Sequence, residues 1–316
     1  MPTFYIKHLT KYSYSGDVID AANQIMLYPI NDSYQKVVNQ EIIINNNPNI
    51  ETHTDFFDNT VGTFMITEPH NFLSIESDTE VITFPKNLPE ATVDVQKQWG
   101  ELETLKNRAE FIDFLRVEQF SGTSEISDWL KSNGYKAKSP FSVVQSLCEF
   151  FFSQFEYVQG LTTVHSTLDE VWKLKAGVCQ DFTSIMLQAV RMCGIPARYV
   201  SGYISTHQGM TRGEGATHAW VEAYLPFYGW LGFDPTNNVI ANDSHVRLAV
   251  GRKYSDCSPV KGVFKGKVED DLFVRVKVSS AKEKNDSLVF PENSMVSEDT
   301  NSFQKNLEYI QQQQQQ

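Results

Sequence analysis

The first part of the chain alternates apolar and polar positions in the manner of β-strands. Short segments rich in Val, Ile, Phe and Tyr are separated by turns rich in Asn, Asp and Pro. These segments cover residues 4–14, 24–28, 37–44, 62–67 and 72–84. The pattern predicts an N-terminal β-rich domain over residues 1–84, and no residue in it indicates catalytic chemistry.

After a linker at 85–100 that contains two prolines, the apolar spacing becomes helical. The spacing predicts one helix over 102–114, a short one around 126–130 and a third over 141–157. A fourth helix is predicted after Gly177, because apolar residues there recur at i, i+3, i+4, i+7, i+8 and i+11. They are Phe182, Ile185, Met186, Ala189, Val190 and Cys193. Gly194 and Pro196 end this helix.

The pattern returns to strands after this helix. Residues 197–204, 218–225 and 230–234 predict three strands, and 246–250 and 272–278 are candidates for two more. Beyond residue 280 the chain becomes polar and ends in six glutamines. We therefore expect a second domain over 101–280 and a mostly disordered tail over 281–316.

Composition narrows the range of partners. The 316 residues suit about two domains of ~150 residues. The net charge of −12 argues against binding to nucleic acid or to an anionic membrane surface. No apolar run approaches the ~20 residues that span a bilayer, and the first residues lack a signal-peptide pattern. We expect a cytoplasmic protein without nucleic-acid or membrane partners.

The cysteines do not suggest a disulfide framework or a metal site. The four residues Cys148, Cys179, Cys193 and Cys257 form no CxxC pair, and the chain has no HExxH motif. Cys148 and Cys193 fall in apolar helical patterns and are expected to be buried. We therefore expect no metal ion and no cofactor.

Cys179 differs from the other three because it stands at the start of the predicted helix. Unpaired N–H groups and the helix dipole favour a thiolate there, although Asp181 brings an opposing charge. Further along, His218 lies on a strand whose polar and aromatic face suits a half-open site, and Asp234 ends the next strand. A thiol, an imidazole and a carboxylate are the minimal set for acyl transfer through a thioester.

The hairpin that joins the last two groups poses a geometric problem. A symmetric loop at 226–229 would place His218 opposite residue 237, ~10 Å past Asp234 and on the other face. We therefore expect a one-residue bulge or an asymmetric loop, which Gly229 and Gly232 would permit.

An oxyanion hole for such a reaction requires N–H donors. The backbone N–H of Cys179 is the natural first donor. The second stays open among Trp172, His165 and Gln180.

Several sequence blocks resemble the bacterial transglutaminase-like superfamily. They lie at 177–182, 194–203, 218–222, 232–237 and 250–256, and residues 3–84 resemble the β domain that often precedes its core. The resemblance implies an α+β fold in which a papain-like core, with a Cys-bearing helix packed on an antiparallel sheet, follows a β-rich domain. It also implies that Cys179 is the nucleophile, His218 the base and Asp234 the orienting acid.

The resemblance leaves the reaction open. We expect a peptide or protein amide as substrate, and we favour hydrolysis over transamidation because no acceptor-amine site and no calcium-binding loop are visible. The alternatives are a protein-glutamine acyltransferase and a catalytically idle binding or scaffold protein. The oligomeric state stays open.

Overall fold

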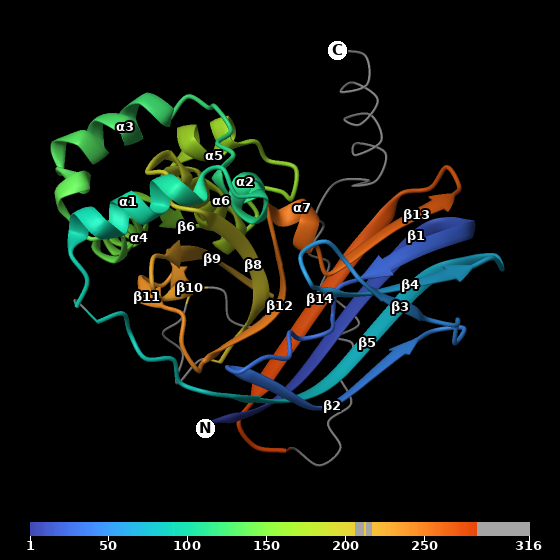
Figure 1. Cartoon of the computed structure of the whole chain (residues 1–316). Helices are drawn as coiled ribbons and strands as arrows, with labels where there is room; N and C mark the ends of the chain where they lie inside the picture. Colours follow the sequence, from blue (N-terminus) through green and yellow to red (C-terminus); the bar gives the residue numbers. More distant parts are fainter. Residues whose placement is uncertain (91, 206–211, 213–216, 283–316) are drawn as a thin grey trace. The chain divides into compact units, whose positions relative to one another are not determined.

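The computed structural model describes residues 1–90, 92–205, 212 and 217–282. It divides the chain into two compact units (Figure 1). One consists of Met1–Thr83 together with the chain from Ser258 onward, and the other is Phe84–Cys257. None of the described helices is long and apolar enough to cross a membrane.

The first unit is an antiparallel sheet built around one long strand. Its strands are β1 (Thr3–Ile25), β2 (Gln35–Ile44), β3 (Glu51–Thr54), β4 (Thr60–Ile66), β5 (His70–Thr83), β13 (Val260–Lys265) and β14 (Asp270–Ser279). They form a seven-stranded sheet in the order β2-β5-β1-β4-β3, with β13 and β14 also paired to β1. The first half of β1 pairs with β5 and β14, and its second half pairs with β4 and β13. The predicted segment at 4–14 and the first two residues of the one at 24–28 are therefore parts of one strand, and residues 26–28 lie beyond its end.

The described residues from Ser258 onward belong to this first unit, whereas the sequence pattern assigned them, up to residue 280, to the second domain of 101–280. Strand β14 pairs with residues 5–14 of β1, and β13 pairs with residues 19–25 of the same strand. Pairing between segments so far apart in sequence leaves no local signal. The hydrophobic pattern therefore assigned β14 to the second domain, although it pairs with β1 of the first unit. Most of the predicted disordered tail at 281–316 lies outside the described residues, since only 281 and 282 are described.

Two histidines of the first unit are structural. The ring of His8 is buried, its Nε2 lies 3.0 Å from the Thr10 hydroxyl, and burial lowers its pKa to about 4. His70 Nδ1 lies 2.8 Å from the Glu68 carbonyl, and its ring packs edge-on against Tyr14. Both rings are therefore held by contacts within the first unit.

The second unit combines helices with a five-stranded antiparallel sheet, as expected for an α+β fold (Figure 1). The helices are α1 (Val95–Leu105), α2 (Ala109–Leu115), α3 (Thr123–Ser132), α4 (Pro140–Gln154), α5 (Leu168–Leu174), α6 (Cys179–Met192) and α7 (Tyr254–Cys257), with a 3-10 turn at Tyr135–Ala137. The sheet has the order β11-β10-β9-β8-β12, formed by β8 (Ala197–Ile204), β9 (His218–Leu225), β10 (Gly229–Asp234), β11 (Val239–Ile240) and β12 (His245–Gly251). Two short parallel strands, β6 (Glu156–Tyr157) and β7 (Ala176–Gly177), lie apart from it.

The helices differ from the sequence pattern in three places. The single helix predicted over 102–114 is broken into α1 and α2. Helix α1 begins inside the predicted linker, because the Asp94 carboxylate accepts hydrogen bonds from the backbone of Gln96 and Lys97. Helix α5 was not predicted, although Thr167 and Glu170 form a capping box at its start.

Helix α6 packs against the sheet with the predicted apolar stripe, whose members are all buried. Its C-terminal end is tied to the sheet by Arg191. The guanidinium of this buried residue donates to the carbonyl oxygens of Ala197, Arg116 and Arg252. Gly194 takes the left-handed conformation just beyond the helix, with φ of 77°. The C-terminal end of α6 is therefore fixed relative to β8.

Candidate active site

Cys179 is the first residue of α6. Its side chain is half-buried, whereas the other three cysteines are buried. Its thiol lies 3.9 Å from the carbonyl oxygen of Thr217, the residue before His218. The helix start therefore brings the sulfur to the beginning of β9.

The turn before Cys179 is held by Asp181. Its Oδ2 accepts hydrogen bonds from the backbone N–H of Val178, at 2.8 Å, and from the hydroxyl of Thr162, at 2.6 Å. A Cβ atom at Gly177 would lie only 2.3 Å from this oxygen, so a glycine is needed there. Burial raises the pKa of Asp181, and its two hydrogen bonds oppose that rise. The carboxylate that the sequence placed beside the sulfur thus caps the helix.

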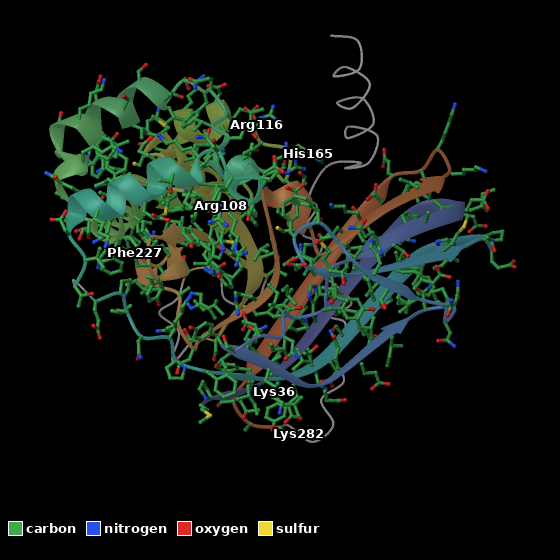
Figure 2. The ribbon with its side chains drawn as sticks, viewed as in Figure 1. Lys36, Arg108, Arg116, His165, Phe227 and Lys282 are labelled. Atoms are coloured by element: carbon green, nitrogen blue, oxygen red, sulfur yellow. The ribbon has the colours of Figure 1, made fainter. Side chains whose placement is uncertain are left out.

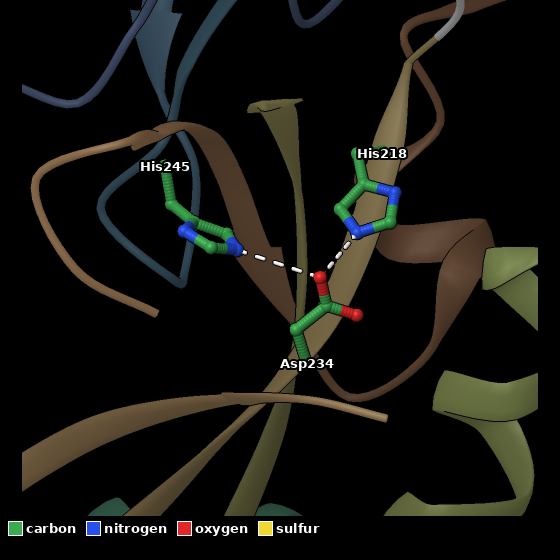
Figure 3. Close-up of side chains that lie close together, drawn as sticks. All are labelled: His218, Asp234 and His245. Carbon is green, nitrogen blue, oxygen red and sulfur yellow. Dashed lines mark hydrogen bonds and ion pairs between the residues drawn. The ribbon is translucent and has the colours of Figure 1, made fainter. Parts of the chain in front are cut away.

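His218 and Asp234 lie together on β9 and β10 (Figure 3). The Nε2 atom of His218 is 2.7 Å from Oδ2 of Asp234, and both side chains are fully buried. The expectation of a half-open strand face is wrong, because β9 is buried on both faces over almost its whole length.

A shorter loop, rather than a bulge, brings these two residues together. Leu225 pairs with Gly229, so the loop holds three residues instead of the predicted four (Figure 2 labels Phe227 within it). The same register continues regularly to the pair Val221 and Phe233, and it places His218 opposite residue 236. Asp234 is two residues away on the same face, a diagonal distance that side chains bridge.

The two glycines named for this hairpin have different roles. Gly229 has φ of 101°, a conformation that side-chain-bearing residues rarely adopt, and it closes the short loop. Gly232 lies within regular pairing, where a Cβ atom would come within 2.5 Å of Ala241 and 3.0 Å of Trp220 Nε1. The expected asymmetric loop is present, and the expected bulge is not needed.

Both oxygens of Asp234 are saturated with hydrogen bonds. Oδ1 accepts from the backbone N–H groups of Thr236, at 2.9 Å, and Asn237, at 3.3 Å. Oδ2 accepts from His218, from the Asn237 amide at 2.8 Å and from His245 at 3.5 Å. Burial would raise the pKa of Asp234, but the charge and hydrogen bond of His218, with help from His245, hold it well below its usual range.

The imidazole of His218 is set up to carry a proton. Burial lowers its pKa, but the Asp234 carboxylate and the nearby Cys179 sulfur more than offset burial and raise it to about 10. Since Nε2 binds Asp234, Nδ1 is the remaining nitrogen, and it has no hydrogen-bond partner in the part of the chain that the structure describes. One ring nitrogen is therefore committed to the carboxylate, and the other is not.

Sequence reasoning missed two members of this network, His245 and Asn237. Asn237 donates to Asp234 and also accepts a hydrogen bond from the backbone N–H of Arg212, at 2.9 Å. It lies inside the sequence block 232–237 that resembles the superfamily, but nothing in the pattern gave it a role. His245 lies at the start of β12 and carries no sequence signal of its own.

His218, Asp234 and His245 also form the one grouping of three potential metal ligands within the described ranges, with ligand atoms inside 4.8 Å of one another. A single oxygen, Asp234 Oδ2, already accepts from both rings. We therefore interpret the trio as a hydrogen-bonded network.

The candidates for a second oxyanion donor are not equivalent. Trp172 is buried between Phe120 and Phe155, and the Lys175 ammonium lies over its ring, so it is a core residue. Gln180 follows Cys179 directly in α6 and is half-buried. Gln180 therefore lies nearer the thiol along the chain than the other two.

This fold and site define a class: an α+β, papain-like unit in which a cysteine-bearing helix packs on an antiparallel sheet that carries His and Asp. Residues 129–235 match the transglutaminase-like superfamily, and residues 4–82 match the bacterial transglutaminase-like N-terminal region. The chain belongs to the transglutaminase-like superfamily.

Two mycobacterial relatives align along most of the chain, and a third relative aligns along half of it. An uncharacterised protein of Mycobacterium leprae is 29% identical over 278 residues, which is 87% of this chain and 97% of that protein. An uncharacterised protein of Mycobacterium tuberculosis is 30% identical over 280 residues, 82% of this chain and 87% of that protein. A protein-glutamine gamma-glutamyltransferase of Pseudomonas aeruginosa is 26% identical over 173 residues, 50% of this chain and 23% of that protein.

A solved structure supports the fold along nearly the whole length. The crystal structure of a candidate cysteine protease from Cytophaga hutchinsonii matches with a TM-score of 0.71 at 20% identity. The match covers 93% of this chain and 95% of that one. At this identity the likeness shows a shared fold, and the reaction has to be argued from the site.

Proposed function

We propose that this protein is a thiol-dependent amide hydrolase in which Cys179, His218 and Asp234 act as nucleophile, proton carrier and orienting acid. The observation that carries the proposal is the buried contact of 2.7 Å between His218 Nε2 and Asp234 Oδ2. It commits one ring nitrogen to the carboxylate and leaves Nδ1 for the sulfur at the start of α6.

The chemistry follows from this arrangement. The raised pKa of His218 favours an imidazolium beside a Cys179 thiolate. The thiolate attacks the amide carbonyl carbon, and the imidazolium gives its proton to the leaving amine as the C–N bond breaks. The neutral imidazole then takes a proton from water, whose oxygen attacks the thioester carbonyl carbon as the C–S bond breaks. A carboxylic acid is released, and the Cys179 thiolate and the His218 imidazolium are regenerated.

A second candidate function is transamidation, in which a primary amine replaces water in the last step. The similarity to the Pseudomonas aeruginosa gamma-glutamyltransferase over half of the chain supports it. We favour hydrolysis, because no residue of the described site suggests a pocket for an acceptor amine. A peptide or protein amide is the proposed substrate in either case.

The first test of this proposal is alkylation by iodoacetamide at neutral pH. We expect one fast-reacting thiol per chain, assigned to Cys179 by peptide mapping, because Cys148, Cys193 and Cys257 are buried. The variant Cys179→Ala should lose the fast phase, and the matched variant Cys193→Ala should keep it. Alkylation of Cys179 no faster than Cys257 would contradict an activated nucleophile.

The second test separates the reaction types. Glutaminyl and peptide amides are incubated with the protein, with and without a primary amine, and products are followed by mass spectrometry. Free acid without amine supports hydrolysis, whereas an amine adduct supports transamidation. A binding module would give a different result. The wild type would bind the peptide without turning it over, and Cys179→Ala would bind it equally well.

A further inference from the structure

The buried network of Asp234 contains a second imidazole, His245, that the proposed reaction does not use. Its Nε2 lies 3.5 Å from Asp234 Oδ2, the oxygen that also binds His218 (Figure 3). Figure 3 shows the two rings approaching this oxygen from different strands, β9 and β12. His245 is 6% exposed, so water does not compete appreciably for this contact.

The other side of the His245 ring fixes where its proton lies. Nδ1 is 3.4 Å from the backbone nitrogen of Asn242 and 3.2 Å from the hydroxyl oxygen of Ser244. A backbone N–H can only donate, so Nδ1 accepts from Asn242 and the ring hydrogen of a neutral imidazole belongs on Nε2. A turn closed by the His245 N–H on the Asn242 carbonyl holds these residues in place. His245 therefore donates to Asp234 through Nε2.

The surroundings keep this imidazole neutral. Burial lowers the pKa of His245. The Asp234 carboxylate opposes this decrease, whereas the positive charge on His218 lowers the pKa of His245 further. The Trp220 ring packs edge-on at 5.1 Å, and Ile204 of β8 is the register partner of His245. Arg247, two residues along β12, lies 3.8 Å from Glu222.

A neutral donor in this position differs from a cationic one. A second cation would compete with His218 for the same oxygen and would weaken the ion pair between His218 and Asp234. An uncharged N–H fixes the carboxylate rotamer and weakens the attraction between the two charges less than a second cation would. Together with Asn237, it leaves Asp234 one orientation, the one that faces His218.

We propose that His245 is a positioning residue of this site: as a neutral Nε2–H donor it orients Asp234, and through Asp234 it keeps His218 protonated beside the Cys179 thiolate. The inference rests on the proposed function, because it assigns a role within the same thiol chemistry. It adds a fourth side chain and a third strand, β12, to the arrangement.

The test compares variants of the full chain by the pH dependence of Cys179 alkylation with iodoacetamide. His245→Leu removes the donor, whereas His245→Gln keeps an N–H near the Nε2 position. In His245→Leu, Asp234 is no longer held, His218 is less readily protonated, and the thiolate forms only at higher pH. We expect the pH at which the alkylation rate is half-maximal to rise by at least about half a unit. The rate at pH 7 should fall about 3- to 10-fold. His245→Gln should restore most of the wild-type pH midpoint and most of the wild-type rate at pH 7.

A buried control distinguishes positioning from loss of packing. Val246 is the neighbouring, fully buried residue of β12. Val246→Ala should lower stability, as measured by urea denaturation, without moving the pH midpoint. The inference is overturned if folded His245→Leu keeps the wild-type midpoint, or if His245→Gln behaves like His245→Leu.

The outcomes also separate this inference from the proposed function. If wild-type Cys179 shows no fast alkylation at neutral pH, the proposed function fails and His245 has nothing to position. If the wild type alkylates fast and the His245 variants do not alter the profile, only the role of His245 fails.

Discussion

At the scale of single residues, Asp234 is a fully buried carboxylate whose two oxygens each accept more than one hydrogen bond. Its residue type and its place at the end of a strand were visible in the sequence, as were Cys179 at a helix start and His218 on the preceding strand. The donors that hold it were not, because Asn237 and His245 reach Asp234 only through the turn after β10 and through β12.

The variant Asp234→Asn should be destabilised as well as impaired. An amide has only one oxygen, so its NH₂ group must face either the two backbone N–H groups or the side-chain donors. One set of buried donors is then left unsatisfied, and the free energy of unfolding should fall by about 1–3 kcal/mol at pH 7. Urea denaturation measures this change. The exposed Asp128, which forms a surface pair with Lys131, is the control, and Asp128→Asn should stay within about 0.5 kcal/mol.

The same comparison has a defined pH dependence. Because folding lowers the pKa of Asp234, its ionisation stabilises the protein above the ordinary value of 3.8, and this contribution is lost as the pH falls below it. The stability gap between wild type and Asp234→Asn should therefore be smaller at pH 3 than at pH 7. An equal gap at both values would contradict the lowered pKa.

At the scale of elements, the hairpin of β9 and β10 decides whether the site can form. A four-residue loop would put His218 and Asp234 on opposite faces, and a three-residue loop puts them on the same face. The sequence revealed the conflict but not its solution, since loop length depends on the positive φ of Gly229. Local pattern could not choose between a bulge and a shorter loop.

The two glycines of this hairpin make a matched pair of variants. Gly232→Ala brings a Cβ atom against Ala241 and Trp220, so β10 must shift, at a cost of about 1–3 kcal/mol. Because β10 carries Asp234, the rate of Cys179 alkylation should fall several-fold. Gly229→Ala has open space but an unfavourable φ, and it should cost about 1–2 kcal/mol with little change in alkylation. Equal alkylation in both variants would mean that β10 does not control the site.

At the scale of the whole molecule, the chain returns to its first unit after completing the second. Strands β13 and β14 pair with β1, so residues 258–279 complete a sheet that residues 3–83 begin. This arrangement predicts that the first unit needs the end of the described chain in order to fold, whereas Phe84–Cys257 holds all the elements of the second unit.

Truncation tests this division. A chain that ends at Cys257 leaves β1 without two partners, and its first unit should lose protease resistance and β-sheet circular dichroism. The second unit should keep its unfolding transition, which tryptophan fluorescence reports because all five tryptophans lie between residues 99 and 230. A chain that ends at Lys282 retains every described strand and is the control. Protease resistance of residues 1–83 in the shorter chain would contradict the prediction.

The sequence by itself determined the local features of this protein. Apolar periodicity located the stripe on α6 and strands β8, β9 and β10, and the residue types of Cys179, His218 and Asp234 indicated thiol chemistry. These features depend on interactions within a few residues, which periodicity and helix-end preferences record. Only the tertiary structure decided the loop register, the capping role of Asp181, the addition of His245 and the return of β14 to β1. The loop register depends on the backbone conformation of the turn, and the buried position of Asp181 depends on Thr162. The addition of His245 and the return of β14 to β1 depend on pairing between distant segments, which leaves no trace in local order along the chain.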